Sequence, residues 1–180
     1  MLDETRIKEA KDNIKKYLAD RLIGREAFKP IVFETLRRNH RDSLNLAEHV
    51  YHNNLSSLWT VVISYYSMFY LANAVLYRLG YKVGPRLAHK VTADGLIEFV
   101  RNKLRKSLLE DYEEIKEEAL EIAGAKADTL IYSFDQERTK RSIFQYETTE
   151  EIKLGKAGVS FQRAKEFSLE LNKLLNDIKP

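Results

Sequence analysis

The sequence predicts an all-α fold, an antiparallel helical bundle of four to five long helices with an extra helix at the N-terminus. The 180-residue chain has only seven glycines and three prolines, and Lys, Glu, Leu and Ala, which favour helices, are abundant. The run from Leu55 to Tyr77 contains no charged residue, although 32% of the chain is charged. No segment alternates apolar and polar residues convincingly, as a half-buried strand would. These observations favour long helices packed around one uncharged helix.

The first helix is expected over residues 4–19, where apolar residues form a narrow stripe at helical spacing. Gly24 is expected to end this helical segment. A second helix is expected from about residue 25 to residue 51, because apolar residues keep an approximate helical period there. The pair Asn53 and Asn54 is expected to end it.

The uncharged run is expected to form the central helix, capped at its start by Asn54 or Ser56 and ended after Leu79 by Gly80. A run of this length raises the question of a membrane span, which needs about 20 apolar residues. Lipid would leave the many hydroxyl groups of the run without hydrogen-bond partners. A helix that is apolar on all sides is instead typical of the buried centre of a soluble bundle. No membrane contact is therefore expected.

Beyond the central helix, residues 81–91 are expected to form a loop. Thr92 can cap the helix that follows, which carries apolar residues as far as Leu104. A long helical pattern then covers residues 108–146, with a possible break at Gly124.

The end of the chain is expected to hold two further helical segments. Thr148 or Thr149, with acidic residues just after it, looks like a helix start. Gly155 and Gly158 are expected to interrupt that segment, and the last helix is expected over residues 159–178.

The composition limits the function classes. A chain of this length suits a single helical domain over residues 1–180. Cysteine is absent, which excludes disulfides and thiol chemistry and fits a reducing cytoplasm. The first residues lack the apolar core of a signal peptide. A net charge of +3 is too small by itself to argue for nucleic-acid binding.

Charge is nevertheless unevenly distributed. Between residues 78 and 106 there are eight basic residues against two acids, and between residues 110 and 121 there are seven acids against Lys116. Such blocks are usually solvated helix faces, and we favour that interpretation. The alternative is a basic surface that faces a polyanion, with the acidic block facing a partner or a neighbouring subunit.

Few residues have a pattern typical of catalytic or metal sites. His49 and His52 are three residues apart beside Glu48, a spacing that can share a metal ion. No third ligand is evident, so two surface histidines are favoured, and no metal or cofactor is expected. His89, within the basic loop, could contact a phosphate, although a solvated loop histidine is favoured.

The strongest candidate site is a basic one. Arg138 and Arg141 are three residues apart on one predicted helix face, and Tyr146 follows. Two guanidinium groups on one face can bind a phosphodiester through planar, two-point contacts. Tyr146 could stack on a base or bind a phosphate oxygen. The alternative, favoured by these residues taken alone, is an arginine pair that forms salt bridges with neighbouring acids.

The central helix and the segment that follows it resemble a known family, the HEPN domains (higher eukaryote and prokaryote nucleotide-binding). The resemblance covers roughly residues 36–175, so residues 1–24 form an N-terminal helical extension. It implies an antiparallel bundle of four or five helices that is often dimeric. The residues that match the family motif are Ser64, Tyr65, Tyr66, Met68, Phe69, Tyr70, Ala72, Gly80, Pro85, His89, Lys90 and Phe99.

The resemblance also implies functions. Many HEPN domains are ribonucleases of toxin–antitoxin or antiviral systems, often paired with a nucleotidyltransferase. Their catalytic signature is Arg, four to six residues, then His. Arg141 matches the Arg, but Tyr146 occupies the His position. A phenol with a pKa near 10 is a poor substitute for imidazole in proton transfer. Either cleavage is lost or other groups supply it, and the chain resembles the non-catalytic members more.

Three functions are therefore expected as alternatives. The first is a cytoplasmic nucleotide- or RNA-binding module without strong ribonuclease activity. It would be a homodimer, possibly with a nucleotidyltransferase-type partner, and would bind through Arg138, Arg141 and Tyr146. The second is a metal-independent, toxin-like ribonuclease that uses Arg141 and Tyr146 as catalytic residues. The third is a non-catalytic protein-interaction module.

Overall fold

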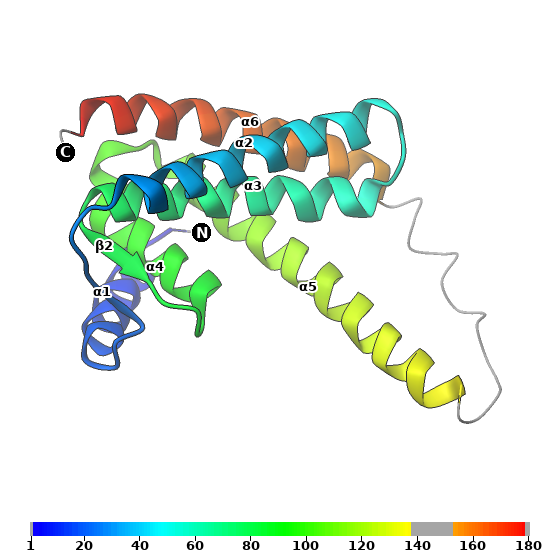
Figure 1. Cartoon of the computed structure of the whole chain (residues 1–180), viewed down its shortest axis with the longest axis horizontal. Coiled ribbons are helices and arrows are strands. Elements are labelled where there is room, and N and C mark those ends of the chain that lie inside the picture. Colours follow the sequence, from blue (N-terminus) through cyan, green and yellow to red (C-terminus); the bar gives the residue numbers. More distant parts are fainter. Residues whose placement is uncertain (1, 138–152, 179–180) are drawn as a thin grey trace.

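The computed structural model describes residues 2–137 and 153–178, and side chains for residues 2–124 and 155–178. It confirms an all-α helical bundle with an extra N-terminal helix (Figure 1). The described elements are, in chain order, α1 (Glu4–Ala19), β1 (Ile23–Arg25), α2 (Pro30–His52), α3 (Ser57–Arg78), β2 (Tyr81–Val83), α4 (Ala88–Val100), a 3₁₀ turn (Arg101–Lys103), α5 (Lys106–Glu137) and α6 (Lys153–Asp177).

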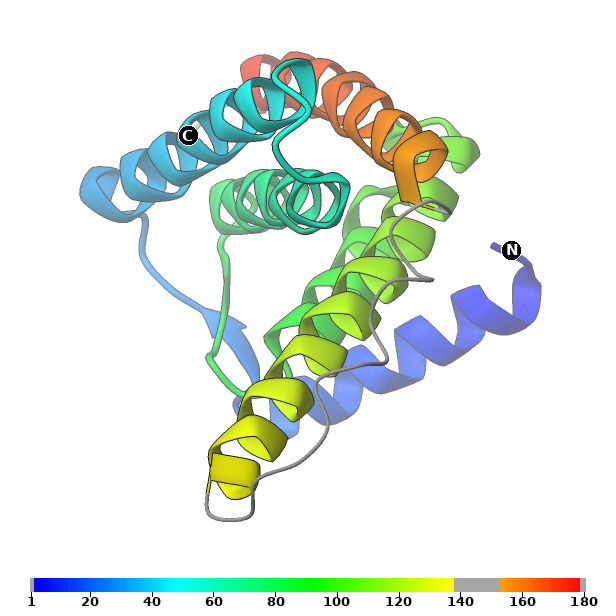
Figure 2. The same cartoon turned by 90° about the vertical axis from the view of Figure 1, so that its right-hand side faces the viewer.

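The uncharged run forms the central helix α3, as the sequence predicts. Its N-cap is Ser56, whose hydroxyl accepts a hydrogen bond from the backbone N–H of Trp59 at 3.2 Å. Gly80 follows the helix with φ of 87°, a left-handed conformation that favours glycine. Figure 2, which looks along α3, shows α2, α6 and α5 arranged around it.

α3 is the one described helix that is long and apolar enough to cross a membrane. Of its most apolar 18-residue window, 61% is buried inside the protein. A helix covered in this way by its neighbours is typical of the core of a soluble bundle.

Contacts between helix ends give the direction of each helix. α2 runs antiparallel to α3, since the Tyr77 hydroxyl near the end of α3 accepts the backbone N–H of Lys29 before α2, at 2.9 Å. α6 runs in the same direction as α3, since Arg78 donates to the backbone carbonyl of Ile178 at 3.3 Å. α5 is antiparallel to α6 and leaves the bundle obliquely (Figure 1).

The expectation that the chain holds no strand is wrong in detail. β1 and β2 form a two-stranded antiparallel sheet that joins the start of α2 to the end of α3. Arg25 lies over the ring of Tyr81, with its guanidinium carbon 3.9 Å from the ring centroid. Segments of three residues are too short to show alternation, and this pairing links residues far apart in the chain, so local sequence could not reveal it.

Two helix starts differ from the prediction. α2 begins at Pro30 rather than near residue 25, because β1 takes up the intervening residues. α4 begins at Ala88, so Thr92 is not its cap. Thr92 is buried inside α4, and its hydroxyl accepts a hydrogen bond from Asn73 of α3 at 3.1 Å. The sequence around a threonine that caps a helix does not differ from that around a buried threonine with a partner on another helix, so the sequence alone could not tell the two apart.

Glycine does not interrupt the last two helices. α5 continues through Gly124, and α6 continues through Gly155 and Gly158. At Gly158 a Cβ atom would lie 2.9 Å from the hydroxyl oxygen of Tyr51. The glycine there allows α2 and α6 to approach closely, which offsets its lower helix propensity.

The acidic block of α5 is less solvated than the sequence predicts. Asp111 and Glu114 pair with Arg163 of α6, each at 3.0 Å. Glu113 pairs with Arg6 of α1 at 2.6 Å. The acids therefore attach α5 to helices on both of its sides.

Buried His40 is expected to make folding stability fall below neutral pH. Its Nδ1 lies 3.1 Å from the Ser67 carbonyl, and burial lowers the pKa of His40 more than this bond raises it. Above the unfolded-state pKa of about 6.5 the histidine is neutral in both states. Below it, the unfolded chain takes up a proton more readily, so stability is lost as the pH falls. The melting temperature should fall between about pH 7.5 and pH 5.5. His40→Gln should reduce this dependence of the melting temperature on pH. The exposed His49 provides the control, since His49→Gln should leave the dependence unchanged. If the wild type and both variants showed the same dependence, His40 would not be its cause.

Candidate functional site

A groove of about 650 Å³ opens where α1, the start of α4 and α5 meet. That volume lies within the usual range for small-molecule sites. Its lining combines apolar, basic and acidic side chains. The lining residues are Arg6, Glu9, Pro85, Leu87, Ala88, His89, Lys90, Glu113, Lys116, Glu117 and Leu120.

His89, in the first turn of α4, is held by aromatic residues. Its Nδ1 lies 2.7 Å from the Tyr65 hydroxyl of α3. Its ring centroid lies 4.6 Å from that of Phe69 and 5.8 Å from that of Tyr66. The favoured interpretation of His89 as a solvated loop histidine is therefore wrong, because α3 packs rings against it and half-buries it.

The protonation states follow from burial. Burial lowers the pKa of His89, and the positive charge of Lys116 lowers it further. Burial raises the pKa of the Tyr65 hydroxyl. At neutral pH the Tyr65 hydroxyl is protonated and the imidazole is neutral; we assign the hydroxyl as the donor to Nδ1, which places the ring proton on Nε2. Nε2 makes no hydrogen bond to the described residues, so it can donate to a ligand in the groove.

Lys116 is a nearly buried cation on α5. Its side chain is 11% exposed, and the nearest described carboxylate oxygen, on Glu117, is 3.7 Å from Nζ. Glu117 itself is 78% exposed, so the surrounding water weakens the pairing. Among the described residues this ammonium therefore has no close, buried counter-charge. An anionic group bound in the groove would stabilise it.

The start of α4 adds partial positive charge to the same groove. Leu87, which precedes the helix, has φ of 53°, and no side chain caps the first turn. The first backbone N–H groups of a helix have no intrahelical acceptor, and the helix dipole favours an anion beside them. Lys90 contributes a full charge at the rim.

Acidic residues border the other side of the groove. Glu9, Glu113 and Glu117 contribute to its lining, and an acidic hollow that includes Glu110 and Glu114 adjoins it on α5. The groove therefore has a basic wall at the start of α4 and an acidic wall along α5. Such an arrangement admits a small anion more easily than a long polyanion.

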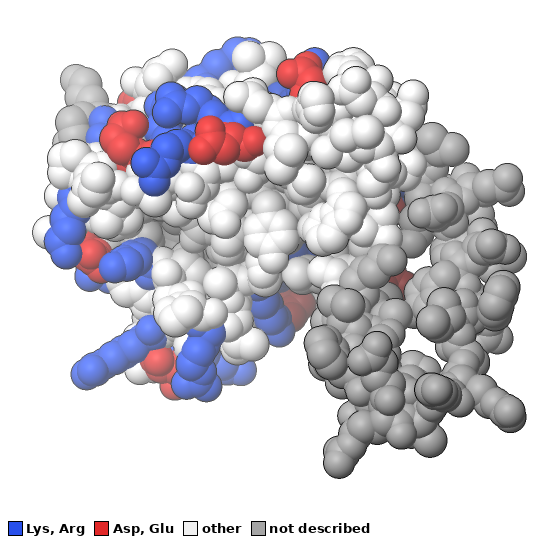
Figure 3. Space-filling model, turned by 45° about the vertical axis from the view of Figure 1, so that its right-hand side comes forward, with Lys and Arg blue, Asp and Glu red and all other residues white. Residues whose placement is uncertain are grey.

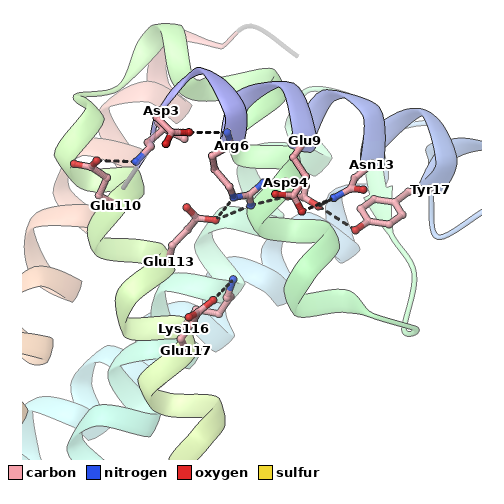
Figure 4. Close-up of polar contacts among 11 residues, drawn as sticks. Asp3, Arg6, Glu9, Asn13, Tyr17, Asp94, Glu110, Glu113, Lys116 and Glu117 are labelled. Carbon is pink, nitrogen blue, oxygen red and sulfur yellow. Dashed lines mark hydrogen bonds and ion pairs between the residues drawn. The ribbon is translucent and has the colours of Figure 1, made fainter.

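Beneath the groove, α1 is attached by a buried polar cluster around Asp94 of α4 (Figure 4). Asp94 is fully buried and pairs with Arg6 at 2.6 Å. Its other oxygen accepts hydrogen bonds from the Tyr17 hydroxyl at 3.0 Å and the Asn13 amide at 3.1 Å. Arg6 also binds Glu113 at 2.6 Å, so two carboxylates already balance its charge.

The sequence-predicted arginine site lies elsewhere in the chain. Arg138, Arg141 and Tyr146 all fall outside the described residues. Their binding role and their catalytic role both stay predictions.

The histidine pair shows no metal geometry. His52 lies 3.9 Å from Glu48 and is 61% exposed, and the neighbouring His49 is exposed. Within residues 2–137 and 153–178, no three histidine or acidic side chains are grouped to bind a metal ion. His49 and His52 are thus both exposed, as the sequence analysis favours.

Comparison with known proteins adds no relative. No protein-family model, curated protein sequence or solved structure matches this chain. The fold and the groove define the class directly: an all-α helical bundle with a mixed-charge groove beside a histidine that its central helix holds in place.

Proposed function

We propose that this protein is a HEPN-like nucleotide-binding module with little or no ribonuclease activity, and that the phosphate of the nucleotide binds in the groove beside His89. The observation that carries the proposal is the Lys116 side chain, nearly buried and without a close counter-charge among the described residues, beside a neutral imidazole whose Nε2 we assign as a donor. Both groups suit a phosphate oxygen. The resemblance to HEPN domains supports the proposal, because Tyr65 and Phe69 of the matching motif hold His89, another motif residue.

The geometry favours a free nucleotide over an RNA strand. The groove has the volume of a small-molecule site, and Leu87 and Leu120 offer apolar surface to a base. The acids of α5, some of which line the groove while others line the adjoining hollow, would repel the further phosphates of a strand. A single nucleotide needs only one favourable phosphate position, and Lys116, the one base among these acids, provides it together with the start of α4.

Binding without cleavage follows from the residues at the family's catalytic positions. Tyr146 stands where the family has its histidine, and a phenol transfers protons poorly near neutral pH. Incubation with RNA in the absence of metal should therefore give no cleavage. Metal-independent cleavage that is lost in Arg141→Ala would instead favour the ribonuclease alternative.

Equilibrium binding of a fluorescent adenine nucleotide at low salt tests the proposal. Lys116→Gln should weaken binding by about tenfold or more, since it removes a charge-assisted contact to phosphate. The matched control is Lys156→Gln. Lys156 also lies near a glutamate, at 3.6 Å, but its side chain is 61% exposed, so this change should leave binding unaltered.

Each other outcome would overturn part of the proposal. Undetectable nucleotide binding would refute it, and RNA binding alone would favour the RNA alternative. Binding that is lost in Arg141→Ala but kept in Lys116→Gln would place the site at the predicted arginine pair instead of the groove.

A further inference from the structure

One side of α5 changes in chemical character where it borders the groove. Leu120, Lys116 and Glu113 line the groove, and their spacing of four and three residues places them on the same side of the helix. Glu110, three residues nearer the start of α5, continues this side into the adjoining hollow. Figure 4 shows Glu110, Glu113 and Lys116 in this order along the helix. An apolar residue, a cation and two acids therefore follow one another along one line.

The acidic end of this line keeps an excess of negative charge. The hollow there is lined by four glutamates and one cation, Arg6. Arg6 lies 2.6 Å from Glu113 and also 2.6 Å from the buried Asp94, so it is shared between two carboxylates. Lys106 lies 3.8 Å from Glu110 and is 58% exposed, so water weakens that pairing. Further negative charge placed in the hollow would be repelled.

A nucleotide has an order of groups that this line can match. Its first phosphate is joined to the base through the sugar, and any further phosphates extend away from the base. With the base against Leu120 and the first phosphate at Lys116, further phosphates would extend along α5 toward the acids. Glu113 and Glu110 lie about 4.5 Å and about 9 Å beyond Lys116 along the helix axis, at 1.5 Å per residue. Those distances are short enough for a second and a third phosphate to approach the acids.

We propose that the groove selects nucleoside monophosphates and discriminates against nucleoside diphosphates and triphosphates. The inference rests on the proposed function and adds to it the number of phosphates that the site accepts. A monophosphate brings its whole charge to Lys116, to Nε2 of His89 and to the first turn of α4. A diphosphate or triphosphate would place further charge beside Glu113 and Glu110, where like charges repel. Specificity then comes from repulsion of the longer phosphate chains as well as from attraction of the first phosphate.

The opposite orientation of the nucleotide is less favourable. It would put the base among the glutamates of the hollow and direct further phosphates past Leu120. The apolar lining residues Leu87 and Leu120 would then face a charged chain instead of the base. Lys90 is exposed at the rim, so solvent and salt screen its attraction for a second phosphate. The orientation with the base at Leu120 is therefore the one that sets the specificity.

The face of the protein drawn in Figure 3 offers a nucleotide no comparable arrangement. There, Lys, Arg, Asp and Glu gather above and below a broad area that contains none of them. A phosphate in that area would find no cation to bind. In the groove, by contrast, an apolar residue and a cation lie one helical turn apart on α5. Discrimination between nucleotides can therefore be assigned to the groove by changing the residues that line it.

Competition binding to the full chain tests the inference. The probe is a fluorescent adenosine monophosphate, at low salt and with a chelator that removes divalent cations. Unlabelled adenosine monophosphate should displace the probe best, and each added phosphate should weaken competition by about fivefold or more. Adenosine, which has no phosphate, should compete weakly.

Removing the charge of an acid in the line should reduce this discrimination. Glu113→Gln should raise the affinity for the diphosphate by about threefold or more and change that for the monophosphate less, and its amide oxygen can still accept from Arg6. Glu110→Gln leaves the pairing of Arg6 unchanged and should act mainly on the triphosphate. The matched control is Glu34→Gln, because Glu34 is exposed on α2 and lines neither the groove nor the hollow. Circular dichroism verifies that each variant is folded.

The outcomes separate this inference from the proposed function. If no nucleotide competes, or if adenosine competes as well as its monophosphate, the phosphate site at Lys116 is wrong and the proposed function is refuted. If Lys116→Gln weakens every nucleotide but the triphosphate binds as well as the monophosphate, the inference alone is overturned. Discrimination that is unchanged in both Glu113→Gln and Glu110→Gln would overturn it too. So would a preference for the triphosphate once Mg²⁺ is restored, because a cation would then join the added phosphates to the acids.

Discussion

Replacing Asp94 with alanine is expected to lower the free energy of unfolding by about 3–5 kcal/mol, the cost of removing one partner from a buried ion pair. Asp94 is fully buried, while the side chain of its partner Arg6 is 19% exposed. The change would leave that guanidinium only Glu113 as a counter-charge. It would also remove the acceptor of the Tyr17 hydroxyl and the Asn13 amide. Chemical denaturation followed by circular dichroism measures the effect.

An exposed ion pair provides the control for this prediction. Asp12 pairs with Lys15 at 3.0 Å on the solvent side of α1, so Asp12→Ala should cause no measurable change, because exposed pairs contribute little. Hydrogen exchange should also locate the damage: in Asp94→Ala the amides of α1 should exchange faster, while those of α3 should not lose protection selectively. If Asp94→Ala and Asp12→Ala were equally stable, the buried cluster would not be what attaches α1.

The central helix could be predicted from sequence because its signals are local. Ser56, the uncharged run and Gly80 lie within one segment, and each has one dominant structural meaning. A run of more than 20 uncharged residues in a highly charged chain is expected to avoid water, and its many hydroxyl groups favour a protein core over lipid. The bundle around it follows from the few helix breakers.

The features that the sequence did not predict depend on contacts between residues that are distant in the chain. Tyr17 and Asp94 are separated by 77 positions, and β1 pairs with β2 across the whole of α2 and α3. No local pattern distinguishes a buried Asp94 from an exposed acid. The apolar residues around it, in the segment VTADGLI, are the one signal that indicates burial.

The sequence did not predict the candidate groove, although it named His89, one of its lining residues, as a possible phosphate contact. The motif that resembles HEPN domains includes Tyr65 and His89, yet their hydrogen bond could not be inferred, because His89 was expected in a loop. Nothing in the sequence around Lys116 indicated that it would line a groove. It is the one base within an acidic block, and such blocks are normally solvated. Its burial arises because α5 packs across the start of α4, which only the tertiary structure reveals.

Replacing Tyr65 with alanine is expected to cost about 3–5 kcal/mol of folding stability, the usual price of removing a buried aromatic side chain. Tyr65 is fully buried. Its ring centroid lies between 5.5 and 6.2 Å from those of Tyr66, Phe69, His89 and Tyr112. The alanine would leave a cavity where α3, α4 and α5 meet. Thermal and chemical denaturation both measure the loss.

Tyr65→Phe separates the ring from the hydroxyl. The phenylalanine keeps the packing but leaves Nδ1 of His89 without its donor, so stability should fall by only about 1–2 kcal/mol. Nucleotide affinity should fall as well, because a free imidazole can place its proton on either nitrogen, and Nε2 would no longer be held as the donor. Tyr65 is in this sense a positioning residue for His89.

Two measurements distinguish positioning from a purely structural role. Nitrogen NMR of the wild-type imidazole should report a proton on Nε2, and Tyr65→Phe should shift the ring toward a mixture of tautomers. The control is Tyr70→Phe, since Tyr70 is only half-buried on α3 and its hydroxyl makes no described hydrogen bond; it should change neither the tautomer nor nucleotide affinity. If Tyr65→Phe matched the wild type in both measurements, the Tyr65–His89 bond would serve packing alone.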